Sequence, residues 1–181
     1  MIAIRNLMEK DAPLMLEWMH DKDIQRRFVK DMMGKTLEEV KDFCKTNSDL
    51  DGVEDGNSRH FAVVDTNDDE YLGTISLKDV SVLHQRAEYA ISLRRKAWGQ
   101  GIAFKATQLL LAKAFNEYGL HRVYLNVLED NLPAIHLYEK CGFRFEGEFR
   151  EHIIKGEKYM NWKWYSILKD EFNADRADAY L

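Results

Sequence analysis

Apolar and polar residues alternate in several short segments of the chain, a pattern typical of strands that are buried on one face. Residues 86–93 show it most clearly, with Ala87, Tyr89, Ile91 and Leu93 alternating with Glu88, Ala90 and Ser92. The same reasoning predicts strands over residues 1–6, 60–64, 71–77, 122–128, 144–154 and 159–168. Polar turns at 65–69 and 155–157 join two pairs of these strands.

Other segments repeat apolar residues at intervals of three and four, the spacing of a helix that packs on a core. They predict helices that begin at Asp11 and that span 36–45, 101–118 and 131–141. Pro13 falls in the first turn of the first helix, where proline is tolerated. Thr36 and Glu39 form a capping box at the start of the second helix, and Gly119 ends the third. The expected core-facing residues of the first two helices are Leu14, Met15, Trp18, Val40, Phe43 and Cys44.

The predicted elements follow the order strand, helix, helix, three strands, helix, strand, helix and two strands. This order predicts an α+β fold with a mixed sheet. The chain has 181 residues, which is long enough for one domain with a sizeable core. We expect a single domain over residues 1–170 and a polar C-terminal tail over 171–181, because no repeat, linker or low-complexity segment interrupts the chain.

Composition narrows the range of partners. The net charge of −5 counts against a nucleic-acid partner, because the phosphates of nucleic acids require a basic surface. No run of residues is long and apolar enough to span a membrane. Cys44 and Cys141 form no disulfide framework or zinc pattern, and the histidines show no metal-ligand spacing. We therefore expect a cytoplasmic protein without a metal.

Two glycines mark the start of the helix predicted over 101–118. Gly99 and Gly101 lie one residue apart, just after the basic run Arg94-Arg95-Lys96. Glycine lets a ligand approach the backbone closely, and the unpaired N–H groups of a first helical turn attract anions. The stretch from Trp98 through Gly99, Gln100, Gly101 and Ile102 to Ala103 is therefore a candidate pyrophosphate cradle. A plain strand-to-helix turn remains open, as does a solvated basic loop at Arg95 and Lys96.

Known phosphate motifs fit this stretch only in part. The dinucleotide fingerprint fails because Phe104 stands at the position of its third glycine, and no Gly-Lys-Ser/Thr of a P-loop is present. A second block, Asn131-x-x-Ala134-x-x-x-Tyr138 followed by Gly142-Phe143, comes later in the chain. Together with Lys96-x-x-Gly99-x-Gly101, it resembles the GNAT superfamily of N-acetyltransferases over roughly residues 59–168. Lys96 replaces the usual glutamine or arginine of the first motif.

The resemblance implies a three-layer fold in which strands 86–93 and 122–128 run parallel and splay apart. The rest of the sheet would be mostly antiparallel. Acetyl-CoA, as co-substrate, would place its pantetheine arm in the gap and extend the sheet by hydrogen bonds. The residues implied to contact it are those of the cradle, with Lys96, and in addition Ile91, Ser92, Leu93, Asn126, Asn131 and Ala134.

The implied chemistry is direct attack of an amine on the thioester. Tyr138 is the predicted general acid, because the departing thiolate, with a thiol pKa of ~8.5, takes up a proton. Glu88 is the predicted general base, acting through water on an amine with a pKa of ~10. Each of these residues also has a purely structural interpretation. Tyr138 would then be a half-buried core residue, Glu88 would pair with Arg86, and Asn131 would only cap its helix. Cys141 lies at a helix C-terminus, where the dipole raises a thiol pKa, so we expect no acyl-enzyme.

The sequence predicts the type of reaction more closely than it predicts the acceptor amine. Three stretches, 4–7 with Asp11, 86–89 and 142–147, are similar to a branch that holds spermidine and ribosomal-protein N-terminal acetyltransferases. A polyamine is the first acceptor expected, a protein N-terminus the second, and a nucleotide-linked amino sugar the third. A non-catalytic acyl-CoA-binding module and an enzyme for longer acyl groups are alternatives. Trp162 and Trp164 share one face of the last strand. They could pack on the sheet, form a wall of the acceptor site or form the interface of a homodimer.

Overall fold

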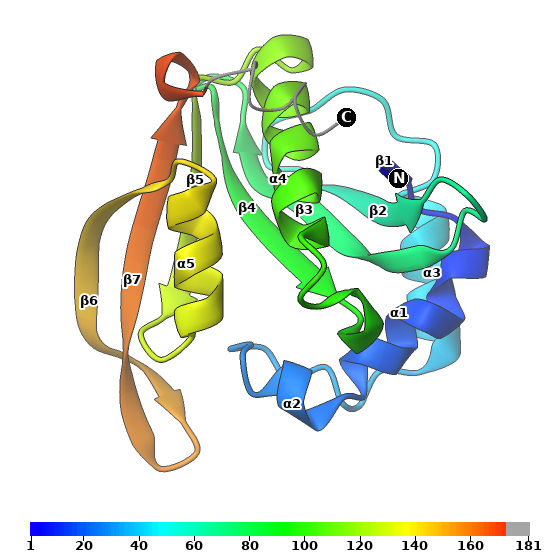
Figure 1. Cartoon of the computed structure of the whole chain (residues 1–181), viewed down its shortest axis with the longest axis horizontal. Coiled ribbons are helices and arrows are strands. Elements are labelled where there is room, and N and C mark those ends of the chain that lie inside the picture. The colour runs from blue at the N-terminus through cyan, green and yellow to red at the C-terminus, as the bar shows by residue number, and fades with distance from the viewer. Residues whose placement is uncertain (173–181) are drawn as a thin grey trace.

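The computed structural model describes residues 1–172, and its centre is a twisted seven-stranded sheet (Figure 1). The strand order is β1-β2-β3-β4-β5-β7-β6, and every neighbouring pair is antiparallel except β4 and β5. This confirms the predicted mixed sheet. The strands are β1 (Ile2–Asn6), β2 (Arg59–Asp65), β3 (Tyr71–Ser81), β4 (Arg86–Leu93), β5 (Arg122–Leu128), β6 (Arg144–Lys155) and β7 (Lys158–Leu168).

The helices are α1 (Ala12–Met19), α2 (Lys22–Gln25), α3 (Leu37–Thr46), α4 (Ile102–Ala112) and α5 (Leu132–Lys140). A π-helical turn, Lys113–Glu117, prolongs α4, so the helix predicted over 101–118 is continuous. The sequence pattern missed α2, because four residues are too short to show a helical period. Asp21 caps that short helix by accepting hydrogen bonds from the backbone of Asp23 and Ile24.

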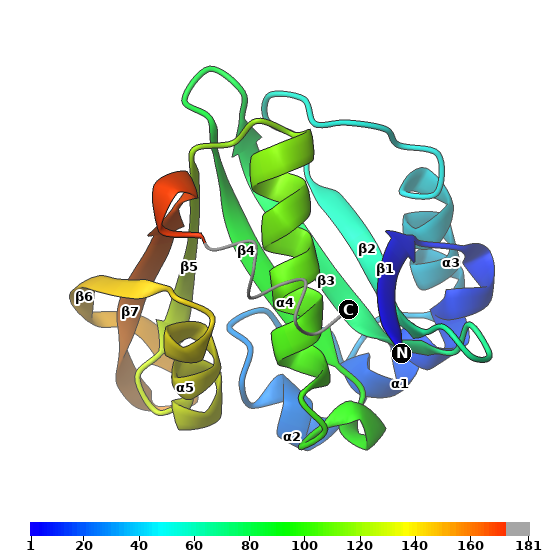
Figure 2. The same cartoon turned by 45° about the horizontal axis from the view of Figure 1, so that its top comes forward.

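Helices cover both faces of the sheet, as Figures 1 and 2 show. Strand β2 illustrates the division, because its apolar residues point alternately to two separate cores. Phe61 and Val63 pack in the cluster that contains α4 and α5, whereas Ala62 and Val64 pack in the cluster that contains α1 and α3. The predicted three-layer arrangement is confirmed.

The buried face of α1 differs slightly from the predicted one. Ala12, Met15 and Trp18 are buried, and Leu14 is only partly covered. The indole Nε1 of Trp18 donates a hydrogen bond of 2.9 Å to the hydroxyl of Tyr71 on β3, which fixes the rotation of the helix. Strand β3 is also longer than the predicted 71–77, because it pairs with β4 as far as Ser81 across a bulge.

Strands β4 and β5 are paired over a short length only. Arg86, Ala87 and Glu88 lie opposite Arg122, Val123 and Tyr124, and the parallel register ends there. Beyond this point β4 continues to Leu93 along β3, and β5 continues to Leu128 along β7. The two strands therefore diverge and leave a gap in the middle of the sheet, as predicted.

The predicted polar tail, 171–181, lies outside the described residues except for its first two. Glu171 belongs to a 3₁₀ turn, Lys169–Glu171, and the ring of Phe172 lies 5.5 Å from that of Phe115 on the π-helical turn. The division at residue 170 stays a prediction. Within residues 1–172, no helix is long and apolar enough to cross a membrane.

The half-buried side chain of His60 should make stability depend on pH. Burial, with help from Lys78 and Arg59, lowers the pKa of His60 from 6.5 to about 4. Between these values the unfolded chain binds a proton that the folded chain does not, so stability falls as the pH drops from 6.5 to 4. The shift corresponds to a loss of up to ~3 kcal/mol in the free energy of unfolding.

Urea titrations at several pH values would measure this loss. We expect His60→Gln to flatten the dependence between pH 6.5 and 4, whereas the matched change at exposed His84 should leave it unchanged. A His60→Gln profile parallel to that of the wild type would contradict the assignment.

Candidate active site

The gap between β4 and β5 opens into a cleft of about 870 Å³. Its walls come from the two diverging strands, the turn that precedes α4, and α5. Most of the site residues predicted from the sequence meet on these walls. They are Glu88, Ile91, Ser92, Leu93, Trp98, Gly99, Gly101, Ile102, Ala103, Asn126, Asn131, Ala134 and Tyr138.

Lys96 and Gln100 are the two predicted site residues that do not line the cleft. The ammonium of Lys96 lies 2.5 Å from a carboxylate oxygen of Glu70, and the amide of Gln100 donates to the backbone carbonyl of Lys96. Both side chains are therefore engaged within the turn itself or with the residue that precedes β3. Their contact with a cofactor stays a prediction.

The rest of the basic run also forms ion pairs within the protein. Arg94 is buried and binds Glu17 of α1 and Glu70, each at 2.8 Å. Arg95 binds Asp21 and Asp23 at the start of α2. These pairs anchor the cradle turn to the N-terminal helices. Sequence spacing could not reveal them, because the acidic partners lie far away in the chain.

The cradle has the backbone geometry that a phosphate requires. Gly99 and Gly101 adopt left-handed conformations, with φ of 74° and 73°. A Cβ atom added at either position would meet no protein atom within 4 Å, so both glycines face open space. Gly101 is the N-cap of α4 and offers no side chain to cap its first turn. Backbone N–H groups and the positive end of the helix dipole therefore suit an anion here.

Trp98 forms the wall of the cleft next to the cradle. Its indole nitrogen donates to the backbone carbonyl of Leu93, at 3.1 Å. The guanidinium of Arg27 lies over its ring, 4.6 Å from the centroid. The indole therefore connects the end of β4 to the segment that follows α2.

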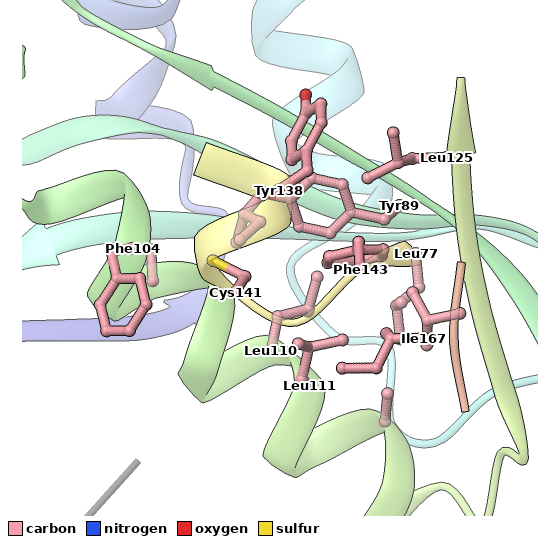
Figure 3. Packing of buried hydrophobic residues seen from close by; sticks show 14 of the residues in the cluster. Leu77, Tyr89, Phe104, Leu110, Leu111, Leu125, Tyr138, Cys141, Phe143 and Ile167 are labelled. Carbon is pink, nitrogen blue, oxygen red and sulfur yellow. The ribbon is translucent and has the colours of Figure 1, made fainter. Parts of the chain in front are cut away.

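Tyr138 enters the cleft from the last turn of α5. Its side chain is 8% exposed, and its ring packs against those of Tyr89, at 5.7 Å, and Phe143, at 6.0 Å (Figure 3). Burial raises the pKa of Tyr138 above its usual value of 10. The phenol is thus protonated at neutral pH, which is the state that a proton donor needs. The neighbouring hydroxyl of Tyr89 is engaged with Thr107, at 2.7 Å.

Glu88 lies on the opposite wall, at the last position of β4 that pairs with β5. The ammonium of Lys78 on β3 lies 2.7 Å from its carboxylate, and the amide of Asn126 on β5 lies 3.5 Å away. The alternative pairing with Arg86 is wrong, because that guanidinium donates to the hydroxyl of Tyr124 instead. Glu88 therefore faces the cleft as part of a small polar cluster from three strands.

Two polar atoms in the walls lack partners within residues 1–172. The hydroxyl group of Ser92 and the amide oxygen of Asn131 are buried, and neither has a hydrogen-bond partner. Asn131 occupies the N-cap of α5, but its side chain makes no capping bond. A buried polar group without a partner is costly, so these atoms fit a ligand that carries amide or hydroxyl groups. The pantetheine arm of acetyl-CoA carries such groups.

Sequence reasoning missed several residues of the cleft. Arg27 and Lys30 come from the segment after α2, Lys78 from β3, and Lys140 from the end of α5. Trp162 of β7, for which an acceptor wall was one of the expected roles, also lines the cleft. The segment after α2 is held over the cleft by Lys155, whose ammonium donates to the carbonyl of Phe28 at 3.0 Å. No local sequence pattern predicts contacts between segments that lie so far apart in the chain. The basic side chains favour an anionic ligand.

Two other kinds of chemistry, a cysteine nucleophile and a metal site, find little support in the described part of the chain. Burial raises the pKa of the Cys141 thiol to about 11, so it is protonated and unsuited to act as a nucleophile. No group of three or more His, Cys, Asp or Glu side chains there could hold a metal ion.

Comparisons with protein families and with individual proteins both point to N-acetyltransferases. A family model described as "Acetyltransferase (GNAT) domain" matches residues 2–144. Spermidine N(1)-acetyltransferase of Vibrio cholerae is 31% identical over 120 residues, which cover 66% of this chain and 69% of that protein. YdaF of Bacillus subtilis, which carries the provisional name of a ribosomal N-acetyltransferase, is 26% identical over 97% of this chain and 95% of its own length.

A solved structure shares the fold over nearly the whole length. It is the crystal structure of spermidine N-acetyltransferase from Vibrio cholerae in complex with CoA and spermine, with a TM-score of 0.82 and 25% identity. The match covers 94% of this chain and 96% of that one. With the splayed strands and the glycine cradle, these findings show that the chain belongs to the GNAT family of N-acetyltransferases, enzymes that use acetyl-CoA as acetyl donor.

Proposed function

We propose that this protein transfers the acetyl group of acetyl-CoA directly to a primary amine in a ternary complex. The observation that carries the proposal is the position of Tyr138 and Glu88 on opposite walls of one cleft that also contains the glycine cradle. Acetyl-CoA supplies an activated acyl group as its thioester. The protein supplies binding, orientation and the two proton transfers.

Each wall has a separate task in this proposal. Gly99 and Gly101 hold the pyrophosphate through backbone N–H groups, and the unpartnered atoms of Ser92 and Asn131 bind the polar groups of the pantetheine arm. A backbone N–H near Ser92 polarises the acyl carbonyl. Tyr138 gives its proton to the departing thiolate. Glu88 accepts, through water, the proton that the attacking amine loses.

We expect Glu88→Gln to lower kcat/KM by about 100-fold at pH 7 if Glu88 is the base. The defect should shrink toward pH 10, because an amine with a pKa of ~10 then loses its proton without help. Profiles of kcat/KM against pH for the wild type and the variant would test this. A defect of constant size across the range would assign Glu88 to acceptor binding instead.

A polyamine is the acceptor that we propose first. Relatives named as spermidine acetyltransferases support it, as does the related crystal structure, which is a complex with spermine. Glu88 is the one carboxylate among the described residues that line the cleft, and it can attract one ammonium group. A protein N-terminus is the second candidate, supported by the name of YdaF. A cytoplasmic location and a homodimer stay predictions.

The first test is thiol release from acetyl-CoA in the presence of spermidine, N-terminal peptides, aminoglycosides and amino sugars. We expect release with one class of amine, and with spermidine foremost. Isothermal titration with acetyl-CoA should accompany the assay. Tight binding without transfer to any amine would overturn the proposal in favour of a non-catalytic acyl-CoA-binding module.

A further inference from the structure

Five aromatic side chains form a continuous array across β5, β7 and β6. Tyr124 stacks on Trp164 with ring centroids 5.8 Å apart, and Phe149 lies 5.3 Å from Trp164. His152 lies 5.2 Å from Phe149 and stacks on Trp162 at 5.3 Å. We call this array the aromatic surface; its members are Tyr124, Phe149, His152, Trp162 and Trp164.

The strand register places the aromatic surface on one face of the sheet. Trp164 lies opposite Asn126, and Trp162 lies opposite Leu128, so these side chains share a face. The intervening residues of β5, such as Leu125, point the other way and pack in the core with α4 and α5. The aromatic surface therefore faces away from α4 and α5, on the same side as Glu88 and Asn126.

The aromatic surface is continuous with the cleft. Trp162 lines the cleft together with Glu88 and Asn126, and Tyr124 lies directly opposite Glu88 in the parallel register. At its other end, Phe149 is 49% exposed. The indole nitrogen of Trp164, between these ends, is buried and has no hydrogen-bond partner in the described part of the chain. The ring of Tyr124 is buried, and the guanidinium groups of Arg86 and Arg122 already lie over it, at 5.6 and 5.8 Å. A molecule that reaches Glu88 from outside can thus lie along the rings of Trp162, His152 and Phe149.

The charges of the cleft make the rings important for a cationic acceptor. Glu88 is already paired with Lys78, and no second carboxylate is present among the described lining residues. A polyamine carries further ammonium groups at a distance from its reacting amine, and these would find no free counterion among the described residues that line the cleft. The carboxylate of Asp79, which borders the aromatic surface, already accepts a hydrogen bond of 3.1 Å from the hydroxyl of Tyr124. Faces of Trp, Tyr and Phe rings attract ammonium groups without a counterion, and their carbon atoms suit the methylene chain.

We propose that the aromatic surface is the subsite that holds the distal ammonium and the methylene chain of a polyamine acceptor, while the reacting amine lies at Glu88. Trp162 is the central contact, because it borders both the cleft and the rest of the surface. This proposal rests on the proposed function and specifies which part of the protein selects the acceptor.

The test compares two acceptors. Spermidine has distal ammonium groups, and heptylamine keeps the reactive amine and a chain but lacks them. Trp162→Leu should raise the KM for spermidine about tenfold, change the KM for heptylamine less than about twofold, and leave the KM for acetyl-CoA unchanged. Trp162→Phe should restore most of the loss, because it retains a ring. Tyr159→Leu is the matched control, since Tyr159 is a 63% exposed aromatic residue of β7 outside the aromatic surface.

Several outcomes would overturn the proposal. An unchanged KM for spermidine in an active Trp162→Leu enzyme would do so, as would an equal rise for both amines, which would indicate apolar contact alone. A change of oligomeric state on size exclusion with unchanged KM would make the surface an interface between copies. Phe149→Leu repeats the test at an exposed position that does not endanger folding. A wild-type enzyme that acetylates no amine would contradict the proposed function itself.

Discussion

Replacement of Tyr138 by phenylalanine should lower kcat by about 10²- to 10⁴-fold and leave the affinity for acetyl-CoA almost unchanged. The ring is buried against Tyr89 and Phe143, and phenylalanine keeps these contacts. Only the hydroxyl group is lost, and with it the proton for the departing thiolate. Steady-state kinetics with the best acceptor, together with titration of acetyl-CoA, would separate the two effects.

Tyr89→Phe is the control for this change. It removes a phenol oxygen from a residue that lines the same cleft, but one that is engaged with Thr107. We expect less than a tenfold fall in kcat, because that hydroxyl already has a partner in the protein. Equal losses for the two variants would indicate that packing, and not proton donation, explains the effect of Tyr138→Phe.

Replacement of Gly101 by valine should weaken acetyl-CoA binding by at least ~100-fold, equivalent to ~2.7 kcal/mol. The residue has φ of 73°, and the new side chain would project into the open space in front of the first turn of α4. A phosphate held by the backbone N–H groups there would collide with it. Titration calorimetry with acetyl-CoA, and circular dichroism to verify the fold, would measure the outcome.

The backbone strain of such a change needs its own control. Gly56 has φ of 75° and an equally open Cβ position, but it lies in the loop before β2 and does not line the cleft. Gly56→Val should therefore carry a similar cost in stability, of about 1–2 kcal/mol, with normal acetyl-CoA affinity. Retained affinity in Gly101→Val would refute the cradle.

The sequence predicted the elements of the fold well where the signal is local. Alternation over 86–93 marks β4 to the residue, and the glycines before α4 show where that helix begins. The splay of β4 from β5 came from the resemblance to a family, since no single strand encodes it. Short α2 and the last residues of β3 were missed, because a four-residue helix and a bulge have no period to detect.

The part of the site that sequence motifs define was predictable from the sequence. Tyr138, Glu88 and both glycines lie on the cleft as expected. The partners of charged side chains were not predictable. Glu88 on β4 binds Lys78 on β3, and Lys96 in the turn after β4 binds Glu70 just before β3, because the pairing of β3 with β4 brings these groups together. Such pairings depend on register and on bulges, which the chain specifies only when it is folded.

The splayed strands also leave unpaired main-chain groups inside the sheet. Three register pairs join two half-sheets, β1 to β4 and β5 to β6, so β4 and β5 each present an internal edge of main-chain donors and acceptors beyond Glu88 and Tyr124. An exposed edge invites pairing with another chain and aggregation. Here α4 and α5 flank the edge, so that a slender ligand with amide groups can join the sheet as a missing strand would. The sheet of the free protein therefore lacks one strand at this point, and we expect the pantetheine arm of acetyl-CoA to pair with the open edge in its place.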